Sequence, residues 1–179
     1  RRVLFRSDRL IGLDAAERLL SCEAGMITGR VQELAADAGL FYPVDFASSG
    51  SSHIGGNIAT NAGGIRVIRY GMTREWVAGL TVVTGSGEVL ELNRGLRKNN
   101  TGYDLMQLFV GSEGTLGVIC EVSLRLTEPP PPVNVLVLAL SSIDVVSEVT
   151  ARFQRTVKLD RKSTRLNSSH SSVSRMPSS

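Results

Sequence analysis

The sequence predicts an α+β fold, and three local patterns support this prediction. Residues 116–126 place an apolar side chain at every second position, which is typical of a half-buried strand. Residues 76–84 and 88–93 are rich in β-forming side chains and flank a Gly-Ser-Gly turn, an arrangement that predicts a hairpin. Residues 28–38 instead repeat apolar side chains at helical spacing, with a glycine directly after them to end a helix.

Two further strands and a second helix are expected in the first third of the chain. Residues 9–13 and 19–23 predict short strands around a polar turn. Thr28 can cap the helix that follows, and Pro43 forbids its continuation. Residues 54–61 predict a short helix, whose N-terminus would face a ligand and add free N–H groups to an anion site.

The segment before the long strand predicts two turns. Residues 99–110 are expected to form a turn that leads into a short helix. Residues 111–115 form a second glycine-rich turn, directly before the strand. Residues 129–132 are four consecutive prolines, which are stiff and extended, so we interpret them as a linker at a domain boundary.

A second domain is expected to begin after this linker. Residues 133–140 predict an apolar strand, and Ser141 with Asp144 predicts the capping box of a helix. One strand and one helix cannot bury both of their faces, so residues 133–160 represent only the start of that domain. The apolar face of the helix would consist of Val146, Val149, Phe153 and Val157.

Charge and composition exclude several classes of protein. The formal net charge is +3, but residues 1–7 carry three positive charges and residues 161–179 carry four, so residues 8–160 have a net charge of −4. This acidic middle argues against a nucleic-acid partner. No apolar run reaches the roughly 20 residues that span a bilayer, and we expect no signal peptide. Cys22 and Cys120 match no metal spacing and are expected to be buried free thiols, which favours a reducing, cytoplasmic location.

Both ends of the chain differ from the rest. Residues 161–179 are rich in serine and aperiodic, which predicts disorder. Their sequence and that of residues 1–7 resemble translated sequencing-adapter read-through. We therefore expect neither end to be native and the natural protein to be longer in both directions.

Residues 48–71, here called the glycine loop, carry the strongest functional signal. They contain six glycines, interleaved with serine, threonine and asparagine. Glycine allows close approach to the main chain, and successive exposed N–H groups form concave nests that hold anions. The loop follows neither the GxGxxG nor the GxxxxGK[ST] pattern, so neither a Rossmann nor a P-loop site is indicated. The alternative is a glycine-rich surface loop without a ligand, although its isoleucines and alanines are unusual for a solvated linker.

Four sequence blocks identify a family resemblance. They are CEAGM at residues 22–26, SHIGGNIATNAGGIRVIRYG at 52–71, NNTGYDL at 99–105 and GSEGTLGVI at 111–119. In this order they resemble the FAD-linked oxidases of the vanillyl-alcohol-oxidase (PCMH-type) superfamily. The branch is the one that contains D-2-hydroxyglutarate dehydrogenase, D-lactate dehydrogenase and the flavin subunit of glycolate oxidase. The resemblance implies a PCMH-type FAD-binding domain over residues 8–128, truncated at its N-terminus and followed by the start of an α+β cap domain.

The resemblance also implies a set of cofactor-binding residues. FAD would lie between two subdomains and be held without a covalent bond, with His53 lining the pocket; covalent attachment through His53 is the alternative. The residues expected near the pyrophosphate and flavin ring are Gly50, Ser51, Ser52, His53, Ile54, Gly55, Gly56, Asn57, Thr60, Asn61, Gly63 and Gly64. Those expected on the other wall are Glu113, Gly114, Gly117, Val118 and Ile119, although the second turn could instead be only a hairpin corner.

Four charged or aromatic residues within these blocks have two possible interpretations each. Arg66 and Arg69 could lie on a solvated face or beside the flavin. Tyr103 and Asp104 could orient their turn or approach the flavin.

The implied chemistry is hydride transfer from the α-carbon of a D-2-hydroxy acid to flavin N5. The family takes its base, usually histidine, and its carboxylate-binding Arg or Lys from the cap domain, where some members also hold a divalent metal. None of those positions is present in this sequence, so the catalytic residues are unknown, no metal ligands are assigned and the chain alone is expected to be inactive. The electron acceptor is also unknown. The alternatives are a flavin electron-transfer module of a larger Fe–S-containing oxidoreductase, or another PCMH-type flavin oxidase.

Overall fold

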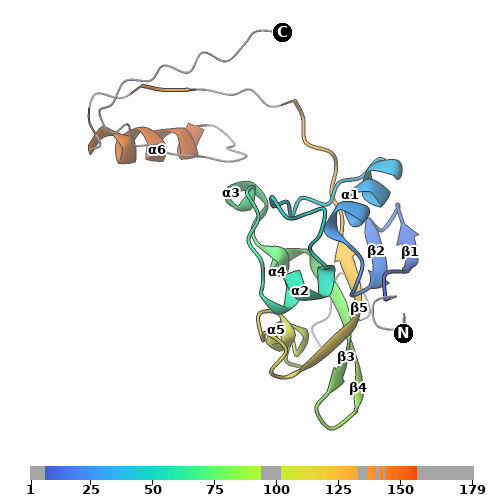
Figure 1. Ribbon diagram of the computed structural model, residues 1–179. Helices are drawn as coiled ribbons and strands as arrows, with labels where there is room; N and C mark the ends of the chain where they lie inside the picture. The colour runs from blue at the N-terminus through green and yellow to red at the C-terminus, as the bar shows by residue number, and fades with distance from the viewer. Residues whose placement is uncertain (1–6, 94–101, 133–136, 140–141, 143, 157–179) are drawn as a thin grey trace.

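The computed structural model describes residues 7–93, 102–132, 137–139, 142 and 144–156 (Figure 1). The described chain forms a five-stranded antiparallel sheet with helices against one face. The strands are β1 (Leu10–Asp14), β2 (Leu19–Glu23), β3 (Val77–Thr84), β4 (Val89–Leu92) and β5 (Gly117–Arg125). The helices are α1 (Thr28–Asp37), α2 (Ile54–Ala59), α3 (Val67–Tyr70), α4 (Thr73–Trp76), α5 (Met106–Phe109) and α6 (Asp144–Thr156).

The strand order is β1-β2-β5-β3-β4, so the last strand in sequence lies at the centre of the sheet. The two strands expected around a polar turn are confirmed as β1 and β2, which pair with each other, and the predicted hairpin of β3 with β4 is also confirmed. Strand β5 joins these two pairs, because Leu124 is opposite Leu20 on β2 and Val122 is opposite Leu80 on β3. The predicted α+β class is therefore confirmed.

One face of the sheet forms the core together with helices α1 and α2. Buried residues alternate along β2 and along the second part of β5, as the period-two pattern predicts for β5, whereas the first four residues of β3 are all buried. Each fully buried Leu or Ile contributes about 1.5–3 kcal/mol relative to exposure. The main buried residues of these five elements are Leu20, Cys22, Leu80, Val82, Val122, Leu124, Val31, Ala35, Ile54 and Ile58.

The start of helix α1 differs from the sequence-based prediction. Thr28 is not the capping residue, because the position before the helix belongs to Ile27, which makes no side-chain capping bond. Thr28 is the first helical residue and is fully buried. Its hydroxyl bonds the glycine loop instead of the helix terminus. The predicted stop is confirmed, because Gly39 directly follows the cap with a left-handed φ of 71°.

Two short helices, α3 and α4, were not predicted. Each has four residues, which is too short for a periodic pattern to be visible. Trp76, expected as the first residue of a strand, instead ends α4, and β3 starts one residue later. The short helix predicted at the end of residues 99–110 is confirmed as α5; the start of that prediction, residues 99–101, lies outside the described residues.

Strand β5 has buried side chains only along its second part. Val122 and Leu124 are almost fully buried, whereas Leu116 is 48% exposed and Val118 is 66% exposed. The alternating pattern correctly predicted the strand but not how far the helices extend over it. In Figure 1, the beginning of β5 and the β3–β4 hairpin project beyond the helices.

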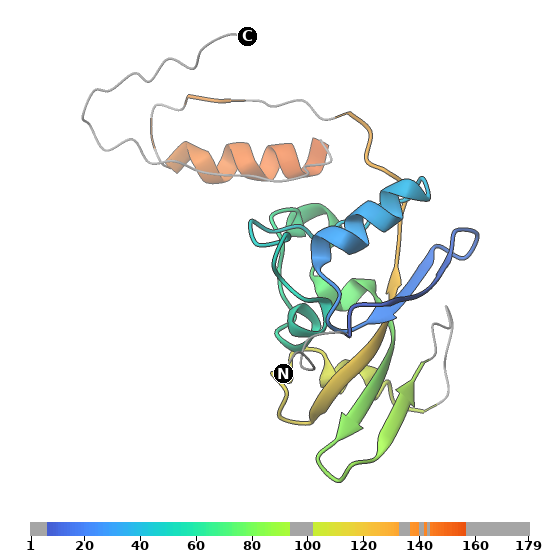
Figure 2. The same ribbon diagram turned by 45° about the vertical axis from the view of Figure 1, so that its right-hand side comes forward.

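Helix α6 lies apart from the sheet in both Figure 1 and the turned view of Figure 2. It begins at Asp144, whose N–H donates a hydrogen bond to the Ser142 hydroxyl. None of its residues is buried, although Val146, Val149 and Phe153 on the expected apolar face are less exposed than most of their neighbours. Ser141, Val157 and most of the predicted strand at 133–140 lie outside the described residues, as does the C-terminal tail.

Candidate cofactor site

The glycine loop begins with a tight turn that is fastened to α1. The N–H groups of Ser51 and Ser52 both donate to the carbonyl of Ser48, which closes the turn. The N–H of Thr28 donates to the Ser52 carbonyl over 2.9 Å, and the N–H of Gly29 donates to Ser49 over 2.8 Å. The start of α1 therefore fixes the position of the loop.

Two N–H groups at the N-terminus of helix α2 are bonded by backbone, so they do not add to the expected anion site. The first two helical N–H groups, on Ile54 and Gly55, donate to the carbonyls of Met26 and Ala24 over 2.9 and 2.7 Å. A Cβ on Gly55 would lie 2.7 Å from the Ala24 Cβ, so glycine is required there for packing. The segment between β2 and α1 thus takes up the first two N–H groups of the helix.

Three polar side chains form a small buried network behind the loop. The Asn57 side-chain amide donates a hydrogen bond of 2.7 Å to the Thr28 hydroxyl, which also lies 2.8 Å from the Ser52 hydroxyl. Asn57 is only 7% exposed and Ile54 is fully buried. These two predicted cofactor residues therefore face the interior, and they position the loop rather than present side chains at its surface.

The other predicted residues of the loop lie at or near the surface. Gly50, Ser51, His53, Gly56, Thr60 and Gly63 are exposed, and Ser52, Gly55, Asn61 and Gly64 are half-buried. Gly64 is needed for packing, because a Cβ there would lie 2.5 Å from the Asp45 carbonyl oxygen. Gly50 and Gly56 differ from it: a Cβ on either would meet nothing within 4 Å, and neither has a positive φ. Packing within the described chain does not explain these two glycines.

The second glycine turn lies against the end of α2. The N–H of Gly111 donates to the Ile58 carbonyl, and the N–H of Glu113 donates to the Ala59 carbonyl over 2.8 Å. Glu113 and Gly114 both have left-handed backbone, with φ of 51° and 79°. The turn links α5 to β5, so the alternative of a hairpin corner is wrong. The structure thus brings together the two glycine segments that the sequence singled out.

The last three predicted residues belong to strand β5. Gly117, Val118 and Ile119 pair with Thr84, Val83 and Val82 of β3. A Cβ on Gly117 would lie 2.7 Å from the Val83 carbonyl oxygen, so close strand pairing requires this glycine. Val118 is exposed, and Gly117 and Ile119 are half-buried.

The two arginines in the last part of the glycine loop, Arg66 and Arg69, are stacked on aromatic rings. The Arg66 guanidinium lies 5.2 Å from the centre of the Phe41 ring and 3.7 Å from the Asp45 carboxylate. The Arg69 guanidinium lies 5.0 Å from the centre of the Tyr70 ring. Both are half-buried, which corrects the interpretation of a solvated face. Tyr103, at 93% exposed, and Asp104 are open to solvent.

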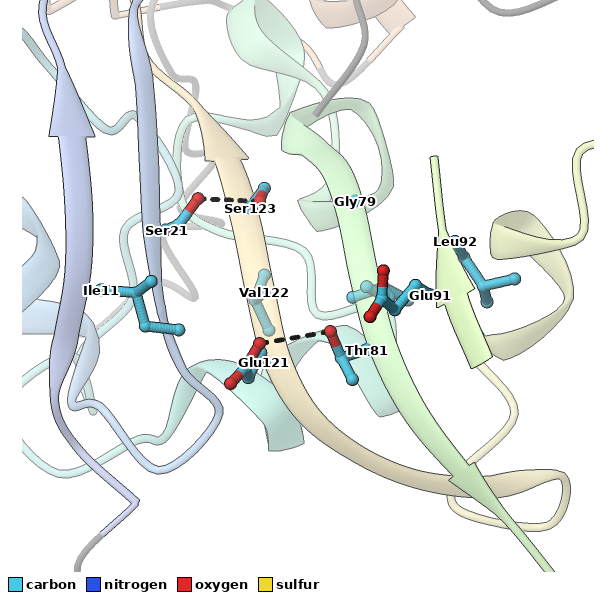
Figure 3. A pocket seen from close by; sticks show the side chains of 10 residues that line it. Ile11, Ser21, Gly79, Thr81, Glu91, Leu92, Glu121, Val122 and Ser123 are labelled. Carbon is cyan, nitrogen blue, oxygen red and sulfur yellow. Dashed lines mark hydrogen bonds between the residues drawn. The ribbon is translucent and has the colours of Figure 1, made fainter. Parts of the chain in front are cut away.

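A cavity of about 260 Å³ lies on the opposite, polar face of the sheet (Figure 3). It contains none of the predicted site residues. The Ser21 and Ser123 hydroxyls lie 2.8 Å apart across its floor, and the Thr81 hydroxyl donates to the Glu121 carboxylate. Glu91 and Glu121 make the cavity acidic, which does not suit an anionic cofactor.

Cysteines and metal ligands add little to this site. Cys22 and Cys120 are both free, as predicted, but only Cys22 is buried. Across the described residues, no group of three or more His, Cys, Asp or Glu side chains is placed to hold a metal ion. In that same part of the chain, every helix is too short or too polar to cross a bilayer.

An antiparallel sheet covered by helices, with two glycine segments meeting beside it, defines an FAD-binding domain of the PCMH type. The chain belongs to the FAD binding domain family, whose model matches residues 3–93. This match confirms the family resemblance and the FAD cofactor of the class.

Curated relatives support a narrower assignment. D-2-hydroxyglutarate dehydrogenase of Xanthomonas citri pv. viticola is 59% identical over 157 residues, covering 88% of this chain and 33% of the relative. The mitochondrial D-2-hydroxyglutarate dehydrogenase of Danio rerio is 45% identical over 141 residues, covering 79% of this chain and 26% of the relative. The chain thus spans about a third or less of these relatives.

Solved structures of alkyldihydroxyacetonephosphate synthase share the fold. One superimposes with a TM-score of 0.62 at 26% identity, covering 72% of this chain and 23% of the other. A second crystal form gives a TM-score of 0.61 at 25% identity.

Proposed function

We propose that this chain is the flavin-binding part of an FAD-dependent D-2-hydroxy-acid dehydrogenase. The observation that carries the proposal is the open space above Gly56, on the exposed side of α2. A glycine inside a helix costs stability relative to alanine, and neither packing nor backbone conformation in the described chain requires it here. Close approach of a bound molecule would require it.

The residues present fit a flavin nucleotide at the loop surface. Gly50 and Gly56 leave room for it, and Ser51, His53 and Thr60 are exposed beside them as polar side chains. On the second turn, Glu113 and Gly114 are exposed on left-handed backbone. The remaining predicted contacts, through Ser52, Gly55, Asn61, Gly63, Gly64, Gly117, Val118 and Ile119, stay part of the proposal.

FAD, when bound, accepts the hydride that a hydroxy acid loses on oxidation. The role of this chain is to hold and orient the cofactor, with His53 in noncovalent contact. We place the base and the carboxylate-binding groups in the remainder of the protein, beyond residues 133–160. The relatives named D-2-hydroxyglutarate dehydrogenase favour a 2-hydroxy acid as substrate, since they are far more similar than the synthase structures.

Domain organisation and location belong to the same proposal. Residues 8–128 would form the flavin domain, residues 129–132 the linker and residues 133–160 the start of the cap. The two free thiols are compatible with a reducing compartment such as the cytoplasm.

Replacement of Gly56 by alanine tests the proposal. In the full chain, Gly56→Ala should leave unfolding stability unchanged or raise it by up to about 1 kcal/mol, because alanine favours the helix. It should weaken FAD binding by about tenfold or more, since a methyl group would occupy the open space. The measurements are thermal unfolding without cofactor and quenching of flavin fluorescence during titration.

Gly12→Ala is the matched control. Gly12 lies on the edge strand β1, and a Cβ there also meets nothing within 4 Å. This variant should bind FAD as the unaltered chain does. Equal affinity of Gly56→Ala and the unaltered chain would contradict the proposed site, and absence of FAD binding by the unaltered chain would contradict the proposed function.

A further inference from the structure

Arg74 connects elements that are far apart in the sequence. It lies in helix α4 and is half-buried. Its backbone N–H donates a hydrogen bond of 3.0 Å to the side-chain oxygen of Asn61, at the end of the α2 segment. Its guanidinium donates to the Gln107 carbonyl, the Gln107 side-chain oxygen and the Val110 carbonyl over 3.1, 2.6 and 2.7 Å.

These bonds reach both glycine segments. Asn61 belongs to the glycine loop, and Val110 directly precedes the second glycine turn. Two backbone bonds, from Gly111 to Ile58 and from Glu113 to Ala59, also connect the segments. These two backbone bonds form only when the second glycine turn is correctly placed against α2. The Arg74 guanidinium bonds the carbonyl of Val110 and so fixes the residue directly before that turn.

Two residues beside Arg74, Asn61 and Gly111, have left-handed backbone conformations. Asn61 has a φ of 47°, a conformation that costs free energy and persists where the surroundings hold it. Its side-chain oxygen accepts the Arg74 N–H. Gly111 has a φ of 85°, and a Cβ there would lie 3.5 Å from the Asn61 Cβ and 3.6 Å from an Arg74 guanidinium nitrogen. Arg74 thus packs where the two segments meet.

The acceptors around Arg74 are all neutral. Within the described residues, its guanidinium forms no ion pair, and its bonds go to two carbonyls and an amide oxygen. A planar fork with several donors can hold acceptors from different chain segments at once, whereas an ammonium group is a compact point charge. The geometry points to orientation of backbone as the role of this arginine.

We propose that Arg74 is a positioning residue that sets the spacing of the two glycine segments for FAD. It contacts neither the cofactor nor the substrate in this role and acts through Asn61 and Val110. The proposal rests on the proposed function, because the spacing matters only if both segments face one cofactor.

Amide hydrogen exchange tests the spacing without any cofactor. In Arg74→Met, the N–H groups of Gly111 and Glu113 should exchange about tenfold faster or more, because their acceptors on α2 are no longer held in register. The amide of Val82 in β3 should keep its protection. Arg30→Met is the matched control, since Arg30 forms only an exposed ion pair with Glu33.

FAD affinity and chemical rescue test whether the spacing of the two glycine segments serves FAD binding. Arg74→Met and Arg74→Lys should both raise the Kd for FAD by about tenfold or more. Methylguanidinium should restore the affinity of Arg74→Ala, and methylammonium should not. Retention of affinity by Arg74→Lys would overturn the positioning role in favour of charge alone.

The outcomes separate the inference from the proposed function. Unchanged exchange at Gly111 and Glu113 in Arg74→Met would overturn the role of Arg74, whatever the affinity of the unaltered chain. Faster exchange with unchanged FAD affinity would also overturn it. Failure of the unaltered chain to bind FAD would instead contradict the proposed function.

Discussion

The side-chain amide of Asn57 donates a hydrogen bond of 2.7 Å to the hydroxyl of Thr28, and both residues are buried. This bond joins the beginning of α1 to the middle of α2, through two residues that are 29 positions apart. Helix α2 belongs to the glycine loop and carries the exposed Gly56. The hydrogen bond between Asn57 and Thr28 therefore links the core to the glycine loop.

Thr28→Val keeps the shape of the side chain but removes this hydroxyl. The Asn57 amide then loses its strongest acceptor in a buried place, so the unfolding free energy should fall by about 1–3 kcal/mol. Urea denaturation followed by circular dichroism measures the change. Thr60→Val is the control, because the exposed Thr60 hydroxyl bonds only its own helix segment and should change stability by less than about 0.5 kcal/mol.

Alkaline pH should destabilise the chain through buried acidic groups. Burial raises the pKa of the Cys22 thiol from 9.0 to about 12, and burial also raises the pKa of the Tyr42 hydroxyl. The unfolded chain loses these protons first, so the stabilisation is complete below about pH 9 and is lost as pH rises towards 12.

Unfolding free energy measured between pH 8 and 11 should therefore decline, and Cys22→Ala should show a shallower decline. Identical slopes in the two proteins would contradict the assignment to Cys22. Iodoacetamide at about pH 8 should modify the partly exposed Cys120 and spare Cys22 until the chain unfolds.

Two adjacent glycines should respond differently to the same substitution. Gly64→Ala should be destabilising by several kcal/mol, because its Cβ would lie 2.5 Å from a backbone oxygen and 2.8 Å from the backbone nitrogen of Asp45. Gly63→Ala should be tolerated, since its Cβ would make only an ordinary contact of 3.5 Å with Met72. Thermal unfolding of the two variants compares them, and equal melting temperatures would argue against this loop geometry.

Removal of residues 129–179 should leave the sheet intact. Helix α6 buries none of its residues, so its loss removes little apolar contact from the core. The unfolding free energy of residues 1–128 should lie within about 0.5 kcal/mol of the full chain. A larger loss would show that α6 packs on the domain in solution.

Local patterns predicted the strands and the longer helices because each of those signals is contained in its own segment. The alternation over 116–126 gave β5, and the Gly-Ser-Gly turn gave the β3–β4 hairpin. The family resemblance located the two glycine segments, which the structure then brings together. The single-turn helices α3 and α4 left no comparable signal.

The sequence did not indicate the contacts between distant segments of the chain. Thr28 was interpreted as a helix cap because its partners Ser52 and Asn57 lie 24 and 29 residues away. Arg74 carried no signal, since its acceptors lie 33 and 36 residues downstream. The first two N–H groups of α2 likewise donate to carbonyls of a distant segment, those of Met26 and Ala24. Local propensity contains no information on such pairs.

The central position of β5 has a consequence for synthesis of the chain. Both β1–β2 and β3–β4 can pair as hairpins as they leave the ribosome, but neither has its inner neighbour until residues 117–125 have emerged. The Ser21–Ser123 contact spans 102 positions, so closing the sheet requires slow, long-range pairing. Until then the inner edges of β2 and β3 stay unpaired, which exposes the nascent chain to edge-to-edge association with other chains.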